Sequence, residues 1–143
     1  MKKLIYNSNQ KYKPSKEEKY MNKDQLKYFE TKLNSWKEQL LTTCNKTLNI
    51  LQESTIHKND PNDVMVSDIN VDLELQTKGR YKKLIEKIDK ALMKIKTGEY
   101  GYCTKTGSEI GIDRLEARPI ANLCIEAQQE QELYKKSHSF KNN

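Results

Sequence analysis

The chain has 143 residues, which is enough for one domain, or for one elongated module with a small satellite, and excludes two large cores. Charged residues make up 32% and hydrophobic residues 35% of the chain, so the apolar supply suits a narrow helix seam better than a round interior. The 26 lysines and arginines exceed the 20 acidic residues and give a net charge of +6, which favours polyanionic partners. Acidic and basic residues alternate closely, however, as in residues 82–90, whereas a nucleic-acid binder usually concentrates its charge in a patch.

The cellular compartment can be predicted from the length of the apolar runs and the number of cysteines. No apolar run approaches the roughly 20 residues of a membrane span. The first residues also turn polar too soon for a signal peptide. Three cysteines, an odd number, argue against a disulfide scaffold and leave metal binding, redox chemistry or packing as their roles. We therefore expect a cytoplasmic protein with no membrane contact.

A first long helix is predicted after a mobile N-terminal arm over residues 1–20, which shows no sustained period. Asn22 and Gln25 form a plausible N-cap and capping-box pair. Apolar or small residues then recur every three or four positions, which is the period of a coiled-coil seam. Its members are Leu26, Phe29, Leu33, Trp36, Leu40, Thr43, Thr47 and Ile50.

The chain is predicted to reverse near residues 59–63, where strong turn residues gather and Asp63 suits the N-cap of a second helix. The alternation of apolar residues over 69–75 would also suit a strand, but the first helix needs a partner of similar length, about 50 Å for 35 residues. A second seam is therefore expected to pair with the first. It comprises Val66, Leu73, Thr77, Leu84, Ile88, Ala91 and Ile95, widened by Ile69, Tyr81, Ile85 and Leu92.

The remainder of the chain is predicted to be compact and turn-rich. Lys94 and Lys96 followed by Gly98 indicate the end of the second helix. Residues 98–127 contain most of the glycines, and a final helix with a tail is expected over 128–143, with helical residues possible from Cys124. The predicted fold is thus dominated by α-helix: an antiparallel two-helix coiled coil over 21–97, a small globular segment and a C-terminal helix.

Several motifs, taken together, resemble those of the DksA/TraR family of bacterial transcription regulators. They are Gly98–Cys103, Glu109–Ile112, Arg114–Pro119 and Leu123–Ile125 in the globular segment, and Tyr20–Asn22, Asp60–Asp63, Leu73–Leu75 and Lys83–Ile85 upstream. The resemblance covers most of the chain from about residue 20 onward. It implies a non-enzymatic factor that binds RNA polymerase directly, a helical hairpin and a zinc-finger-like segment.

The zinc site of that family is reduced in this chain. Family members hold a structural zinc with two C-x2-C pairs, whose four thiolates bind it tetrahedrally. Here Thr106 follows Cys103 and Ala127 follows Cys124 at the second ligand positions. Two thiolates do not supply four donors, so we expect no bound zinc and a segment held by apolar packing. An alternative is a thiol-based redox sensor that uses Cys103 and Cys124.

The hairpin tip carries the second set of candidate residues. In the family the hairpin enters the secondary channel of RNA polymerase, and tip aspartates act near its catalytic centre. Asp60 and Asp63 match these positions, while Met65 stands where DksA has a small residue. Ordinary turn and capping chemistry also explains both acids without any function.

The resemblance further implies cooperation with the alarmone guanosine tetraphosphate (ppGpp), bound between the regulator and the polymerase rim. Arg80, Lys87 and Arg118 match basic positions of that site, and Gln128 replaces an expected lysine. Arginine is well suited to phosphate because its planar fork forms two hydrogen bonds. Solvated helix faces with ordinary salt bridges would explain many of these lysines equally well.

The leading hypothesis is therefore a monomeric regulator that alters open-complex stability in the stringent response and binds no specific DNA sequence. A basic, sequence-independent nucleic-acid binder is the alternative from another class, and it would bind free duplex in a salt-dependent way. An enzyme is not expected, because the chain has only His57 and His138, no glycine-rich phosphate loop and no nucleophile beside a base.

Overall fold

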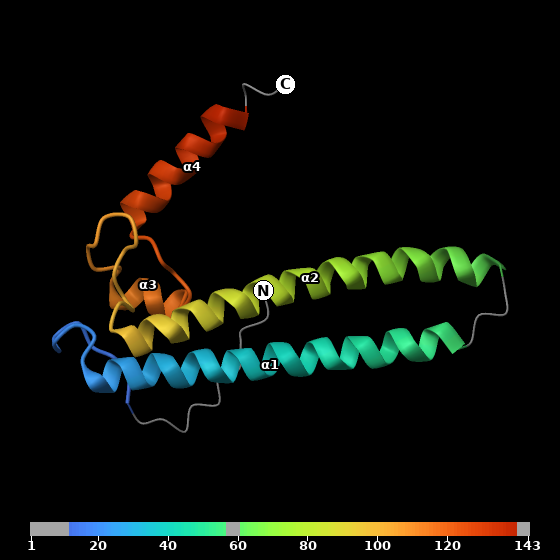
Figure 1. Cartoon of the computed structure of the whole chain (residues 1–143), viewed down its shortest axis with the longest axis horizontal. Helices are drawn as coiled ribbons and strands as arrows, with labels where there is room; N and C mark the ends of the chain where they lie inside the picture. The colour runs from blue at the N-terminus through green and yellow to red at the C-terminus, as the bar shows by residue number, and fades with distance from the viewer. Residues whose placement is uncertain (1–11, 57–60, 140–143) are drawn as a thin grey trace. The chain divides into compact units, whose positions relative to one another are not determined.

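The structure is a computed structural model that describes residues 12–56 and 61–139; the side chains at 47, 50, 51, 53–56 and 61–70 are outside that description. Within these described residues, four helices follow one another: α1 (Lys23–Ile56), α2 (Pro61–Thr97), α3 (Ile112–Ala117) and α4 (Ile125–Ser139) (Figure 1). The prediction of a helical fold is confirmed. The chain divides into two compact units, a hairpin unit (Leu33–Lys90) and a finger unit (Met1–Lys32 with Ala91–Asn143).

The first helix begins as the sequence predicts. The Asn22 Oδ1 atom accepts a hydrogen bond from the backbone N–H of Gln25 at 2.8 Å, which is the N-cap interaction. The Gln25 side chain accepts in return from the backbone N–H of Met21, also at 2.8 Å. The pair satisfies one unpaired donor of the helix, the Gln25 N–H, and the Met21 N–H just before the N-cap.

Within the hairpin unit, α1 and α2 run side by side in opposite directions (Figure 1). Leu33, Leu40 and Ile88 are buried between them, and the Lys37 ammonium lies 2.6 Å from the Asp89 carboxylate. Antiparallel pairing of two long helices is thus confirmed. Among the described residues, no helix combines the length and apolarity needed to cross a membrane.

The predicted seams are correct near the buried leucines and wrong farther along each helix. Leu73 is 57% exposed, whereas Glu74 is only partly exposed and has one buried carboxylate oxygen. Steps of three and four residues backward from Ile88 reach Glu74, so Leu73 lies about 100° away around the helix. On α1, Thr43 is likewise exposed, and the neighbouring Cys44 is partly buried in its place.

The two ends of α2 follow known rules of helix termination. Its first residue is Pro61, which suits a first helical position because the missing N–H would have no partner there. Asp63 therefore lies in the first turn, and the prediction that it is the N-cap is wrong. At the other end, Gly98 has φ +79°, and the backbone N–H of Glu99 donates to the Lys94 carbonyl at 2.9 Å. This is a Schellman cap, as the Gly98 position predicted.

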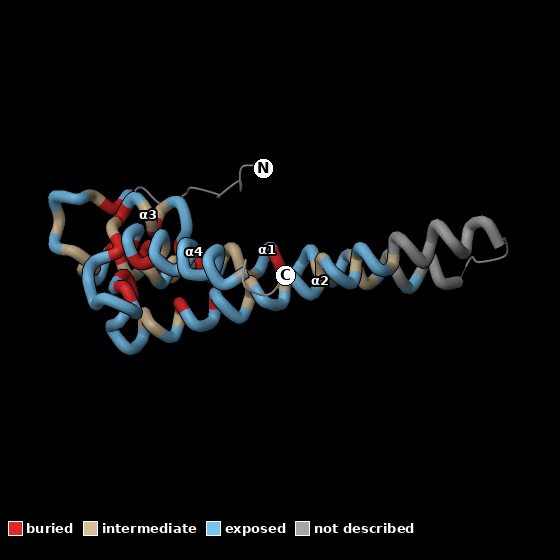
Figure 2. Tube along the Cα trace, turned by 90° about the horizontal axis from the view of Figure 1, so that it is seen from above, coloured by how far each residue is buried: buried red, intermediate tan, exposed pale blue. Residues whose placement is uncertain are grey.

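Most of the residues that the structure describes as buried belong to the finger unit (Figure 2). Its core combines the start of α1, the end of α2, the loop that follows, and α3. The buried hydrophobic residues are Tyr28, Phe29, Ala91, Tyr100, Cys103, Ile110, Ile112, Leu115, Cys124 and Ala127. The short helix α3 was not predicted, because six residues between a glycine and a proline provide too little periodicity to detect.

Candidate functional site

A tight hairpin loop over residues 101–110 positions the first cysteine of the finger unit. The backbone N–H of Cys103 donates to the Ser108 carbonyl at 2.7 Å, and the Gly107 N–H donates to the Cys103 carbonyl at 2.8 Å. An isolated antiparallel bridge joins Tyr102 to Glu109. The adjoining residue Thr104 donates its backbone N–H to the Asn122 carbonyl, which brings this loop beside the segment that carries Cys124.

The two cysteines are buried in the finger unit. Cys103 is 3% and Cys124 is 5% exposed. The Thr106 Oγ1 atom lies 3.7 Å from the Cys124 sulfur. Burial alone would raise the pKa of the Cys103 thiol, but hydrogen bonds from the Thr106 side chain and from the backbone of Cys124, Thr106 and Lys105 lower it to about 6. Cys103 is thus predisposed to be a thiolate near neutral pH.

The donors around these sulfurs do not fit a structural zinc ion. Zinc sites of this type require four donors in a tetrahedron. The Thr106 hydroxyl is neutral and already bonded to the Ser108 hydroxyl at 2.6 Å, and the buried Ala127 provides no donor. In the part of the chain that the structure describes, no three His, Cys, Asp or Glu residues gather in a group able to hold a metal. The residues present therefore leave half of a zinc coordination shell unfilled.

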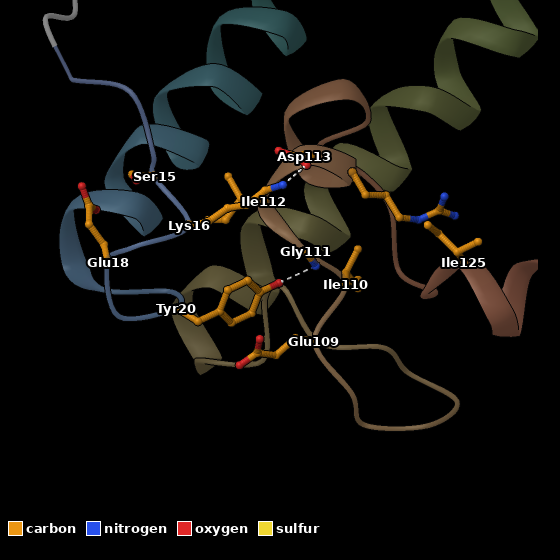
Figure 3. Close-up of a pocket in the computed structure, with 11 residues that line it drawn as sticks. Ser15, Lys16, Glu18, Tyr20, Glu109, Ile110, Gly111, Ile112, Asp113 and Ile125 are labelled. Carbon is orange, nitrogen blue, oxygen red and sulfur yellow. Dashed lines mark hydrogen bonds and ion pairs between the residues drawn. The ribbon is translucent and has the colours of Figure 1, made fainter.

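A tyrosine hydroxyl fastens the hairpin loop to the segment before α1. The Tyr20 hydroxyl donates to the Gly101 carbonyl at 2.6 Å. It also accepts from the Gly111 backbone N–H at 3.0 Å (Figure 3). The Tyr20 ring also meets the Tyr102 ring edge to face, with 5.6 Å between centroids. Burial raises the pKa of Tyr20, so its hydroxyl stays protonated and able to donate. One side chain thus connects both ends of the loop.

The close approach at Gly101 depends on the absence of a side chain. A Cβ atom at this position would lie 2.8 Å from both the Cγ and the sulfur of Met21, and 3.2 Å from the Tyr20 hydroxyl oxygen. Gly101 also has φ +90°, a conformation that other residues rarely adopt. Met21 itself has φ +51°, and the hydrogen bond from its N–H to the Gln25 side chain supports this unusual backbone.

Residues 12–22 belong mostly to the predicted mobile arm, but they make specific contacts. Gln25 is fully buried and donates its amide to the Ser15 carbonyl at 3.1 Å. The Glu18 carboxylate accepts hydrogen bonds from the Tyr12 hydroxyl and from the Asn22 amide. Burial, followed by the Glu18 hydrogen bond, raises the pKa of Tyr12 to about 12, and the same bond lowers the pKa of Glu18. Residues 1–11 of that arm are outside the described residues.

The helix α3 is held to α1 by polar contacts at Glu116. Its carboxylate accepts from the Tyr28 hydroxyl at 2.9 Å, and its backbone carbonyl accepts from the Lys32 ammonium at 2.8 Å. The buried Tyr100 hydroxyl donates to the Pro119 carbonyl at 2.8 Å, just beyond α3. These polar contacts and the apolar core together hold the finger unit. The apolar packing was predicted from the sequence, whereas the polar contacts were not.

A pocket of about 380 Å³ lies between the segment before α1 and the loop before α3 (Figure 3). Its lining mixes charges of both signs with isoleucines, and an ion pair joins Lys16 to Asp113 across it. Arg114, also in the lining, donates its Nε–H to the Leu123 carbonyl at 3.0 Å. The pocket-lining residues include no nucleophile beside a base, so they suggest no catalytic chemistry.

The structure describes only part of the predicted polymerase-contact residues. Asp60 and the side chains of Asp63 and Met65 are outside the described residues. Arg80 and Lys87 are exposed on α2 about two helical turns apart, hence on one face of that helix. Arg118 is exposed in the finger unit, and Gln128 lies on α4, where its amide donates to Glu132 at 2.7 Å.

Comparisons with known proteins match both units. Residues 25–95 match the family described as DnaK suppressor protein DksA, N-terminal domain, and residues 98–133 match the prokaryotic dksA/traR C4-type zinc finger. The chain is 45% identical over 127 residues to the RNA polymerase-binding transcription factor DksA of Caulobacter vibrioides, covering 89% of each chain. It is 39% identical over 125 residues to the protein of the same name from Escherichia coli, covering 87% of this chain and 83% of that protein.

A solved structure shares the fold. Transcription factor DksA2 from Pseudomonas aeruginosa superposes with a TM-score of 0.77 at 33% identity, covering 82% of this chain and 90% of that chain. The matched regions include the paired helices and the finger segment, even though the chain supplies only two of the four cysteines that a C4-type finger requires. The chain therefore belongs to the DksA/TraR family.

Proposed function

We propose that this protein binds RNA polymerase directly and regulates transcription initiation in the cytoplasm, without being an enzyme itself. The observation that carries the proposal is the 45% identity, along 89% of the chain, to a protein named as an RNA polymerase-binding transcription factor. The similar region includes both the helical hairpin and the finger unit. We therefore propose that both units keep the surfaces with which a factor of this kind meets RNA polymerase.

We further propose that the tip of the α1–α2 hairpin enters the secondary channel of the polymerase. A helix of 34 residues such as α1 is about 50 Å long, which is enough to reach far into a channel. Asp60 and Asp63 would then bring carboxylates close to the catalytic centre, where they interact with polymerase side chains or with the surroundings of its Mg²⁺. Met65, beside them, adds an apolar contact. Open-complex lifetime is the expected point of control.

The test of the tip is the double substitution Asp60→Asn with Asp63→Asn, which preserves side-chain size and removes both charges. We expect the variant to bind polymerase as the wild type does, but to lose its effect on open-complex lifetime in single-round transcription from a ribosomal RNA promoter. Asp72→Asn, at an exposed position on α2, is the matched control and should retain the effect. Full inhibition by the double variant would refute the proposed tip function.

The proposal includes ppGpp as a co-regulator. Arg80 and Lys87 share one face of α2, and Arg118 is a third exposed cation, so each is free to meet phosphate groups. Arg80→Ala and Arg118→Ala should therefore reduce the additional inhibition that ppGpp produces while a ppGpp-independent effect remains. Lys90→Ala, elsewhere on the exposed surface of α2, is the control. Equal ppGpp responses in all these variants would exclude this site.

A further inference from the structure

The segment before α1 closes on a loop that follows α2. We call this segment, residues 12–22, the latch. Its central contact is the Tyr20 hydroxyl, which donates to the Gly101 carbonyl at 2.6 Å. The same hydroxyl accepts from the Gly111 backbone N–H at 3.0 Å, as Figure 3 shows. The latch is thus bonded to a part of the chain that lies 81 residues farther along at Gly101.

The Tyr20 hydroxyl binds at the neck of this loop, which we call the cysteine loop and define as residues 101–111. The Gly101 carbonyl also accepts from the Ile110 N–H at 2.8 Å. One oxygen atom therefore takes part both in the bond that closes the loop and in the bond to the latch. Gly111, the other partner of Tyr20, directly follows Ile110. Separation of the two ends of the loop consequently breaks at least one bond of Tyr20.

The cysteine loop covers both thiols of the finger unit. Cys103, within the loop, is 3% exposed, and Cys124 is 5% exposed. The Thr106 Oγ1 atom lies 3.7 Å from the Cys124 sulfur. The ties of the loop to the segment around α4, at Thr104 and Lys105, involve exposed residues. Exposed bonds exchange with water at little cost, so the partly buried bonds of the latch are the ones that hold the loop shut.

The remaining contacts of the latch are mostly polar. The Ser15 carbonyl accepts from the Gln25 amide at 3.1 Å. An ion pair joins Lys16 to Asp113, and both side chains are largely exposed, so it adds little stability. Within the latch only Pro14 is buried. A segment with few buried apolar contacts opens locally at low free energy, so the latch can release while the apolar core stays folded.

We propose that the latch controls access to the two buried cysteines: the cysteine loop is shut while Tyr20 is seated, and it opens when the latch releases. In a C4-type finger a metal ion holds the corresponding loop through four bonds. Here hydrogen bonds at the neck hold it, and they break and reform without any reactant. Opening is therefore reversible, and a thiol reagent reaches Cys103 only after the latch has released. This device does not depend on polymerase binding, so either proposal can fail without the other.

The test is maleimide labelling of the reduced, full-length protein under native conditions, followed at each cysteine by peptide mass spectrometry. Tyr20→Phe removes both bonds at the neck, so Cys103 and Cys124 should be labelled about fivefold faster or more. Cys44, in the hairpin unit, should keep its labelling rate. Tyr102→Phe is the matched control within the loop and should react as the wild type does. Unchanged labelling of the finger cysteines in Tyr20→Phe, or an equal increase at Cys44, would overturn the proposal.

A second pair of variants acts on the latch away from the loop neck. The Glu18 carboxylate accepts hydrogen bonds from the Tyr12 hydroxyl and from the Asn22 amide. Glu18→Ala should therefore loosen the latch and speed the labelling of Cys103, although Glu18 has no hydrogen bond to the cysteine loop among the described residues. Glu17→Ala, at the exposed neighbouring acid, is the matched control and should leave the rate unchanged. Equal rates in the two variants would show that the segment does not act as a unit.

Hydrogen exchange of the unmodified protein keeps the proposal testable if a variant does not fold. The Met21 N–H is bonded within the latch region, to the Gln25 side chain, and the Ile110 and Gly111 N–H groups are bonded at the neck. One opening event should expose all three, so NMR should find similar protection for them. Much faster exchange at Ile110 than at Met21 would show that the loop opens while the latch is seated. Much slower exchange there would show that the loop stays shut after release, and either result would reject the device.

Discussion

At the residue scale, the finger unit depends on a few hydroxyl and amide groups that are far from one another in the sequence. The Tyr20 hydroxyl joins Gly101 to Gly111, the Tyr100 hydroxyl reaches the Pro119 carbonyl, and the buried Gln25 amide holds Ser15. Each bond satisfies a polar group that would otherwise lose its water partners on burial. The bonds of the Tyr20 hydroxyl cross-link the loop that carries Cys103, a segment that C4-type fingers hold with a metal ion.

The Tyr20 hydroxyl provides a direct test of this cross-link. Tyr20→Phe removes both hydrogen bonds and leaves the partly buried Gly101 and Gly111 groups with one partner fewer, so we expect a loss of about 1–3 kcal/mol in the free energy of unfolding. Urea denaturation measures the change. Tyr102→Phe, at an exposed ring that retains its edge contact with Tyr20, should change stability by less than about 0.5 kcal/mol. Equal effects of the two substitutions would contradict a role for the hydroxyl.

Because of the hydrogen bond between Tyr12 and Glu18, the free energy of unfolding should fall as the pH becomes alkaline. Burial and Glu18 raise the pKa of Tyr12 from 10.0 to about 12. A group whose pKa is higher in the folded than in the unfolded protein stabilises the fold while it is protonated. The contribution of Tyr12 is therefore complete below about pH 10 and is lost as the pH rises towards 12. Wild-type protein should therefore lose more stability than Tyr12→Phe over this range, as measured by urea midpoints. Parallel losses in both proteins would be the contrary result.

At the element scale, helix extents were predictable because their signals are local. The cap at Asn22 and the glycine at position 98 set the start of α1 and the end of α2, and the structure confirms both. The phase of the second seam was not predictable with the same accuracy, because apolar residues occur on more than one side of α2. Leu73 fits the period of the pattern, but packing at Ile88 determines which side faces α1, and there Glu74 lies at the seam.

The glycine at position 79, inside α2, allows a test of helix stability. It is exposed, lies inside the helix, and a Cβ atom built there meets nothing within 4 Å. Gly79→Ala should therefore raise the free energy of unfolding by about 1 kcal/mol, because alanine loses less backbone entropy in a helix. Chemical denaturation checks the gain, and Ala91→Gly, at a buried position, should lower stability instead. A destabilising Gly79→Ala would show that the glycine is required by the isolated fold.

At the scale of the whole molecule, the buried residues within the described part of the chain are distributed unequally between the two units. Among the described residues, ten of the thirteen buried hydrophobic side chains belong to the finger unit, and only Leu33, Leu40 and Ile88 belong to the hairpin unit. A segment with few buried apolar contacts opens more readily than the rest of a protein. The two units should therefore differ in local stability.

Hydrogen exchange measured by mass spectrometry tests this difference. Peptides from residues 71–85 of the hairpin unit should exchange faster than peptides from residues 23–32 and 91–100 of the finger unit, because the latter contain the buried Phe29 and Tyr100. The isolated protein at neutral pH is the appropriate sample. Uniform protection along α2 would show instead that both units unfold as one.

The candidate sites were predictable to different degrees. Sequence alone identified the reduced cysteine set, because the spacing of Cys103 and Cys124 and the replacement of their partners can be read directly. It did not identify the contacts of Tyr20 and Gln25, since hydrogen bonds between distant segments produce no periodic pattern. The functional role of the tip residues Asp60 and Asp63 stays a prediction that depends on the family resemblance, because turn chemistry explains both acids without a function.

The contact between Gly101 and Met21 also constrains how this sequence can change over time. A side chain at position 101 would overlap the Met21 side chain at 2.8 Å and would strain a backbone with φ +90°. Shortening Met21 removes the overlap but not the strain, so the effect of a substitution at 101 depends on the residue at position 21. The two positions are therefore epistatic, although the whole hairpin separates them along the chain. Mutational scans should find that a shorter residue at position 21 partly rescues a substitution at position 101.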